Sequence, residues 1–110
     1  DGTRIISRKT VEWMTTNHIP KKMLPLNYNG IVPQLLTAYG FGLGYCINID
    51  PASAGTLGSK GDFGWGSLAD SYCWIDPQEN LVGILMQQFI PALHHAGRRD
   101  FRNAVYQALA

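Results

Sequence analysis

The amino-acid sequence predicts an α+β fold in which an antiparallel sheet is flanked by an N-terminal and a C-terminal helix. Strand-like segments follow one another from residue 39 to 87, and the links between them are too short for crossover helices, so neighbouring strands should run antiparallel. Helical spacing of apolar residues occurs on either side of this region, at residues 7–18 and 97–109. With 110 residues, the chain is expected to form a single domain or part of one.

The first predicted helix follows a capping serine. Ser7 precedes RKTVEWMTTNH and can accept hydrogen bonds from the free amides of the first turn. Val11, Met14 and His18 then fall on one helical face. A helix is therefore expected from about residue 8 to 16.

The second predicted helix contains RRDFRNAVYQALA. An apolar stripe at helical spacing should face the sheet and leave Arg99, Arg102 and Asn103 outward. Together with Arg98, the two arginines form a local cluster that is expected to be a solvated helix end. The stripe consists of Phe101, Ala104, Val105, Ala108 and Leu109.

Four segments between the helices predict strands. In YGFGLGYCINID, Tyr39, Phe41, Leu43 and Tyr45 alternate with glycines, which indicates one strand whose small face packs against a neighbouring segment. These glycines do not match a dinucleotide-binding fingerprint, because the third comes one residue early and no helix pattern follows. FGW, SYCWI and LVGILMQQ supply the other strands. LVGILM is apolar on both faces, so each side of the sheet should be covered.

The connections are expected to be irregular. Residues 19–38 contain three prolines and a glycine, and within them VPQLLTAYG has room for only a short helical turn. Residues 51–61 are rich in Ser, Gly and Ala and should form a flexible connection. Asp76, before Pro77, is expected to cap a turn between the last two strands.

Composition argues against several classes of protein. Hydrophobic residues make up 45% and charged residues 15% of the chain, as expected of a folded globular protein. The net charge of +1 gives no electrostatic argument for nucleic-acid binding. No apolar run approaches the roughly 20 residues of a membrane span. The opening, DGTRIISRKT, does not resemble a signal peptide and reads like the interior of a longer sequence.

Few side chains point to a reactive or metal-binding centre. Cys46 and Cys73 match neither a CxxC metal pattern nor a disulfide-rich scaffold, and are expected to be buried free thiols. His94 and His95 are adjacent and make a poor chelating pair, so no metal or other cofactor is expected. The remaining hydroxyl-bearing candidates, expected to lie in loops or to pack in strands, are Ser53, Ser59, Ser71, Tyr39 and Tyr45.

The segment SKGDFGWGSLADSYCWID, residues 59–76, is the strongest indication of a binding site. It places Trp65 between Gly64 and Gly66, which combines a large flat side chain with backbone that a ligand can approach closely. This arrangement suits the rim of a ligand cleft. A catalytic interpretation also requires a nucleophile, and the chain has no obvious activated serine or cysteine.

Taken in order, these segments resemble the C-terminal part of the serine β-lactamase-like hydrolases, the group of class C β-lactamases, DD-peptidases and family VIII carboxylesterases. The resemblance rests on FGWG, YCWIDP and LVGILM in this order and spacing, and it runs from Ile5 to Leu109. It implies part of a β-lactamase/transpeptidase-like fold with a catalytic cleft at the edge of one strand. It also implies acyl-transfer hydrolysis of an ester, an amide or a β-lactam, with the substrate class left open.

Of the three catalytic motifs of that group, only the third is matched. The first, Ser-x-x-Lys, supplies the acylated serine and a nearby lysine, and the second contains a tyrosine that assists proton transfer. The third corresponds by position to Trp65, Gly66 and Ser67, with Ser67 in place of a glycine. The resemblance therefore implies that these three residues bind substrate, and that the backbone amide of Leu68 is the second donor of the oxyanion hole.

No Ser-x-x-Lys sequence occurs in the chain, since the nearest approximation, Ser7-Arg8-Lys9, is one residue too short. We therefore expect residues 1–110 to be the C-terminal part of such a hydrolase, inactive alone because the catalytic serine is absent. Its expected partners are a small acyl substrate in the complete enzyme and either a missing N-terminal portion or a second copy paired through an exposed sheet edge. The alternative is a non-catalytic module that binds a ligand or oligomerises. The compartment is left open.

Overall fold

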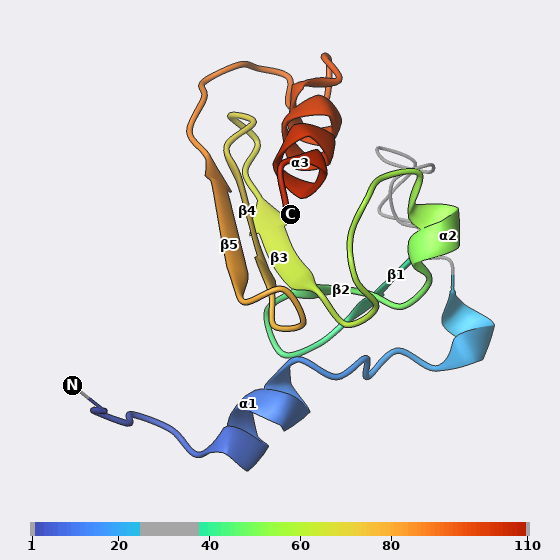
Figure 1. Ribbon diagram of the computed structural model, residues 1–110. Helices are drawn as coiled ribbons and strands as arrows, with labels where there is room; N and C mark the ends of the chain where they lie inside the picture. Colours follow the sequence, from blue (N-terminus) through green and yellow to red (C-terminus); the bar gives the residue numbers. More distant parts are fainter. Residues whose placement is uncertain (1, 25–37, 110) are drawn as a thin grey trace.

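The computed structural model describes residues 2–24 and 38–109. A five-stranded antiparallel sheet forms its centre, and the strands follow the order β1-β2-β3-β4-β5, so that each is paired with its neighbour in the sequence (Figure 1). This arrangement confirms the predicted fold class. The elements are α1 (Arg8–Met14), a 3-10 helix η1 (Lys21–Met23), β1 (Tyr39–Phe41), β2 (Cys46–Asn48), α2 (Pro51–Ala54), β3 (Phe63–Gly66), β4 (Tyr72–Asp76), β5 (Leu81–Leu85) and α3 (Gly97–Gln107).

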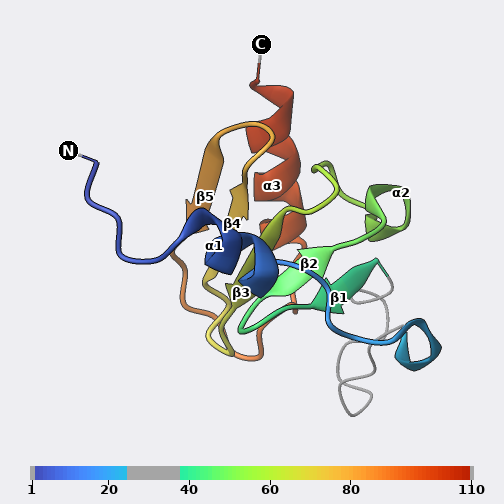
Figure 2. The ribbon, with the colours of Figure 1, turned by 90° about the horizontal axis from the view of Figure 1, so that it is seen from below.

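The two longer helices lie on opposite sides of the sheet. Helix α3 packs across β3, β4 and β5, whereas α1 lies on the other side, in front of β3 in the second view (Figure 2). We call the side under α3 the inner face and the opposite side the outer face. None of the helices in the described ranges is long and apolar enough to cross a membrane.

The inner face is organised around Trp74, which is fully buried. Its indole Nε1 donates to the hydroxyl of Tyr106 at 3.1 Å, and the ring of Phe101 meets it edge to face at 5.9 Å. On the neighbouring strand, Gly83 leaves room for the indole, because a Cβ there would lie 2.1 Å from the Trp74 ring. The core therefore depends on one large aromatic residue that fits against a position without a side chain.

The outer face keeps much of its apolar surface exposed. Val82 and Ile84 of β5 are each 59% exposed, whereas Gly83 between them is buried. The expectation that both sides of LVGILM would be covered is therefore met on the inner face alone. The outer-face side chains are Phe63, Trp65, Cys73, Ile75, Val82 and Ile84, as the register of β3, β4 and β5 requires.

The prediction of a single strand in YGFGLGYCINID is wrong. The segment folds back as a hairpin in which Phe41 of β1 is paired with Cys46 of β2. Gly44 has a φ of +102°, a conformation that glycine adopts readily, and it lies in the reversal between the strands. Gly42 lets α1 approach the hairpin, because a Cβ there would lie 2.3 Å from the carbonyl oxygen of Met14.

Helix α1 is capped as expected but ends earlier. The Ser7 side chain accepts a hydrogen bond from the amide of Thr10 at 3.0 Å, whereas the helix stops at Met14 and leaves His18 beyond its end. The expected irregular connection contains η1, and residues 25–37, including most of VPQLLTAYG, lie outside the described residues. The connection at 51–61 is not wholly irregular, because Pro51 starts the short helix α2.

The expected inner stripe of α3 is only partly right. Phe101 and Val105 are half-buried, but Ala104, Ala108 and Leu109 are exposed. The side of α3 that faces the sheet instead carries three polar residues. These are Arg98, Arg102 and Tyr106, spaced four residues apart, all buried or half-buried.

Arg102, expected to point outward, is only 2% exposed. Its guanidinium pairs with Asp62 at 2.6 Å and donates to the carbonyl oxygen of Leu57 at 2.7 Å and to the hydroxyl of Tyr72 at 3.1 Å. It also lies 5.2 Å from the ring centre of Trp74. The guanidinium is buried because a carboxylate, a carbonyl and aromatic faces satisfy its donors and its charge.

Candidate functional site

The four residues predicted to form a site lie together at the end of β3. Trp65 and Gly66 are the last residues of the strand, and Ser67 and Leu68 begin the turn to β4. The amide of Asp70 donates to the carbonyl oxygen of Ser67 at 3.1 Å, so Leu68 occupies the second position of a hydrogen-bonded β-turn.

Within residues 2–24 and 38–109, one edge of β3 is unpaired beside these residues. Strand β2 is paired with β3 only at Phe63 and Gly64, so its pairing stops before Trp65. The amide of Ser67 donates to the carbonyl oxygen of Ser71 at 2.9 Å, so the backbone groups of Ser67 point toward the β4 side of the ladder. Because this direction alternates from residue to residue along a ladder, the backbone groups of Gly66 point to the open edge.

The amide of Leu68 is free among the described residues, since no hydrogen bond there uses it. The residue itself is 87% exposed. The carbonyl oxygen of the same peptide group, that of Ser67, accepts hydrogen bonds from Asp70 and Arg98, and in a trans peptide the N–H points the opposite way. The edge therefore offers an unpaired N–H donor, which is the group that an oxyanion hole requires.

Trp65 lies on the outer face next to this edge. It is paired across the sheet with Cys73 and is 47% exposed. Its ring meets Phe41 edge to face at 5.4 Å, which supports one side of the indole from β1. The indole is on the opposite face from α3, and about half of its surface is available to a ligand or a covering segment.

Each of the five serines of the chain has its hydroxyl beside a turn, cap or carboxylate group. The Ser67 and Ser71 hydroxyls are 2.8 Å apart, and the Ser67 oxygen also accepts from the amide of Ala69 at 3.2 Å. Ser53 donates to Asp50, and Ser7 bonds within its helix cap. None of the hydrogen bonds of these serines within the described residues is to a lysine or a histidine, so no such base is placed to activate a hydroxyl.

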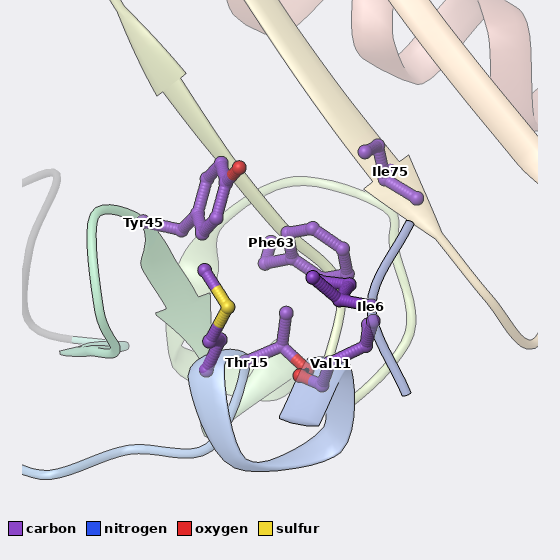
Figure 3. Close-up of a pocket in the computed structure, with 7 residues that line it drawn as sticks. Ile6, Val11, Thr15, Tyr45, Phe63 and Ile75 are labelled. Atoms are coloured by element: carbon purple, nitrogen blue, oxygen red, sulfur yellow. Dashed lines mark hydrogen bonds between the residues drawn. The ribbon is translucent and has the colours of Figure 1, made fainter. Parts of the chain in front are cut away.

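Two hollows among the described residues are lined by side chains other than Trp65. One, of about 220 Å³, separates α1 from the outer face (Figure 3). Its walls are apolar apart from the hydroxyls of Tyr45 and Thr15, and the latter donates to the carbonyl oxygen of Val11 at 2.9 Å. The other, of about 300 Å³, lies beside α2. Neither hollow contains a residue of the candidate site, which lies at an exposed strand edge.

Of the two cysteines expected to be buried, Cys73 is exposed. It lies on the outer face, because the register of β4 turns it away from α3 and toward the side of Trp65. Cys46 is partly buried, and burial raises the pKa of its thiol to about 11. Burial likewise raises the pKa of Tyr72 on the inner face to about 12.

Asp76 caps a turn as expected, and His94 and His95 lie at the surface. His94 and His95 are exposed, and both rings pack against Phe89, at 5.5 and 4.5 Å. Across the described ranges no group of three or more potential ligands gathers to hold a metal ion. Asp76 caps the β4–β5 turn; burial alone would raise its pKa, but hydrogen bonds from two hydroxyls and two turn amides lower it. The donors are Ser59, Tyr106, Gln78 and Glu79.

Two ion pairs around β3 were missed by sequence reasoning. Asp62 precedes the strand and pairs with Arg102, and Asp70 follows it and pairs with Arg98 at 2.7 Å. The signal was present as two carboxylates flanking one strand and two arginines one helical turn apart. Charged residues are expected outward in an amphipathic helix, so the pattern alone favoured solvent.

No family model and no curated protein matches the chain. Solved structures do. EstCE1, described as a hydrolase with promiscuous acyltransferase activity, is 21% identical, with a TM-score of 0.74 over 93% of this chain and 25% of its own. Simvastatin synthase, LovD, from Aspergillus terreus matches in a mutant form, with 24% identity and a TM-score of 0.68, over 90% of this chain and 28% of its own. An unliganded structure of LovD from the same organism is 23% identical, with a TM-score of 0.67 over 89% of this chain and 28% of its own.

These matches confirm the resemblance to β-lactamase-like hydrolases at the level of the fold. They extend over 89–93% of the chain. The chain spans only about a quarter of the length of these enzymes.

Proposed function

We propose that this chain supplies the third-motif strand and one oxyanion-hole donor of a β-lactamase-like serine hydrolase. The observation that carries the proposal is the free amide of Leu68, at the open edge of β3 beside the half-exposed indole of Trp65. The likeness of fold to EstCE1 and LovD supports it, as does the match of FGWG to the third motif.

In the proposed reaction, a serine outside these 110 residues attacks an ester, amide or β-lactam carbonyl. The developing oxyanion accepts a hydrogen bond from the Leu68 amide, and the amide of the attacking serine supplies the second donor. Gly66 has no side chain and lets the substrate lie along the strand edge next to Ser67, and Trp65 lines the acyl side. The oxyanion then collapses and expels the alcohol or amine, which in a β-lactam is the ring nitrogen and stays attached through the opened ring, and this leaves an acyl-serine. Water attacks the acyl-serine and releases the acid and the free serine.

The isolated chain should not hydrolyse nitrocefin or p-nitrophenyl esters, because it contains no activated serine. Turnover is measured by absorbance during successive purification steps. Activity that stays with the chain through purification and is abolished by Trp65→Ala would show that a complete site is present, contrary to the proposal.

A chimera tests the oxyanion role directly. This chain replaces the matching 25% of EstCE1, and the hydrolysis of p-nitrophenyl esters is measured after circular dichroism has established that the chimera is folded. Leu68→Pro removes the N–H donor at a turn position that proline fits, so kcat should fall roughly 10²–10³-fold. Leu68→Ala keeps the amide and is the matched control. Equal kcat values for the two variants, or a folded chimera without turnover, would refute the proposal.

A second candidate function is a non-catalytic module that associates through its sheet. It is favoured by the exposure of Val82 and Ile84 on the outer face and by the edge strands β1 and β5. Size-exclusion chromatography separates the cases. A monodisperse monomer favours an independent ligand-binding module, whereas a dimer, or a change on adding the first three-quarters of a β-lactamase-like hydrolase, favours a chain that needs a partner surface.

A further inference from the structure

Helix α3 reaches the candidate site through Arg98. The Arg98 side chain is 15% exposed, and its Nη2 donates to the carbonyl oxygen of Ser67 at 2.6 Å. The same oxygen accepts the amide of Asp70 at 3.1 Å. The guanidinium also fills the space beside Gly66, where a Cβ would lie 2.3 Å from its Nη1. The end of β3 is therefore held from the inner face by a charged group.

Asp70 holds Arg98 in this place. Its carboxylate pairs with the Nε of Arg98 at 2.7 Å, accepts the amide of Leu93 at 3.1 Å, and accepts a hydrogen bond from Gln87. The residue is 1% exposed and has a φ of +71°, which aspartate tolerates better than most side chains. The turn, the segment after β5 and the start of α3 thus meet on one carboxylate.

The carbonyl of Ser67 and the amide of Leu68 are the two ends of one peptide group. Both acceptor positions of the carbonyl oxygen are occupied, one of them by a charged donor, so the plane of the peptide is fixed. A hydrogen bond to the oxygen also polarises the peptide and strengthens its N–H as a donor. The charge on the inner face therefore acts on the free amide at the open edge.

We propose that Arg98, held by Asp70, is a positioning residue that orients and strengthens the Leu68 amide as an oxyanion donor. This inference rests on the proposed function for its catalytic meaning. The arrangement of the peptide itself is independent of that function, and can be tested in the isolated chain.

The first test is amide NMR of the isotope-labelled chain. Arg98→Gln should shift the Leu68 amide and lower its order parameter from about 0.8 to below about 0.6, with changes confined to residues 66–71. Arg99→Gln is the matched control, because Arg99 is the exposed neighbour. Arg98→Lys and Asp70→Asn provide milder substitutions if Arg98→Gln unfolds the chain. An unchanged Leu68 amide in the folded variants overturns the inference.

The second test is a double-mutant comparison in the EstCE1 chimera. Arg98→Gln should lower kcat by up to about tenfold and leave KM unchanged, and should have no further effect when Leu68→Pro has already removed the donor. Equal loss in both backgrounds would mean that Arg98 acts through general stability, and refutes its positioning role. If instead Leu68→Pro alone has no effect, the proposed function fails, while the NMR result still decides how Arg98 acts on the peptide.

Discussion

Replacing Arg102 by methionine should remove a large part of the stability of this domain. Methionine keeps much of the length of the side chain but neither its charge nor its donors. In the structure those donors reach the carboxylate of Asp62, the carbonyl of Leu57 and the hydroxyl of Tyr72. Asp62 is 1% exposed, so Arg102→Met leaves a buried carboxylate without its counter-charge.

The size of the effect follows from burial. Removing one partner of a buried ion pair costs about 3–5 kcal/mol, because the remaining charge is left without compensation. A domain of this size is stable by only about 5–15 kcal/mol, so this single change removes at least about a fifth of its stability. Asp62→Asn in the Arg102→Met background removes the uncompensated charge and should recover about 2 kcal/mol.

Urea denaturation followed by circular dichroism measures these free energies of unfolding. Arg99→Met is the matched control: its arginine is exposed on the same helix, so the change should stay within about 0.5 kcal/mol. An Arg102→Met variant within about 1 kcal/mol of the unsubstituted chain would refute the reasoning. An added Asp62→Asn that lowers stability further would show that the remaining carboxylate is not the source of the loss.

Three further outcomes follow from the sheet. Gly83→Ala should cost about 1–3 kcal/mol, because its Cβ would lie 2.1 Å from the buried Trp74 ring, and an unchanged melting temperature would contradict this. Ellman's reagent should react quickly with exposed Cys73 but with Cys46 only after unfolding, because burial raises the Cys46 pKa to about 11; two fast thiols would argue otherwise. Asp76 has a lowered folded-state pKa, so its stabilisation is present above the ordinary value of about 4 and is lost as pH falls through the folded value. Asp76→Asn should therefore reduce the loss of unfolding free energy at acid pH, and a variant with the same pH dependence as the unsubstituted chain would contradict this.

The sheet could be predicted because its signals are local. FGW, SYCWI and LVGILM are short β-favouring segments joined by turn residues, and each forms the expected strand next to its neighbour. The hairpin at YGFGLGYCINID was missed for a local reason too. Alternation with glycine satisfies a strand pattern, but Gly44 also permits the positive φ at which the chain reverses.

The burial of Arg102 could not be predicted in the same way. A hydrophobic periodicity counts arginine as outward, whereas its actual position depends on Asp62, a residue 40 positions earlier. Cys73 raises a similar problem, because its strand fixes which way it points, but only the position of α3 decides which face is covered. A hydrophobic pattern within a short stretch of sequence contains neither the distant partner of a side chain nor the helix that covers one face of the sheet.

The missed ion pairs and the predicted site turn out to be parts of one arrangement. Arg102 pairs with Asp62 just before β3, and Arg98 pairs with Asp70 just after it. Helix α3 therefore fixes both ends of the strand that carries Trp65 and Gly66. A strand whose edge must remain unpaired cannot be fixed by a neighbour on that side. Fixation from the inner face leaves the edge open and still rigid, as a preorganised donor requires. In the proposed function, the polar face of α3 thus fixes β3 and leaves its edge free for substrate.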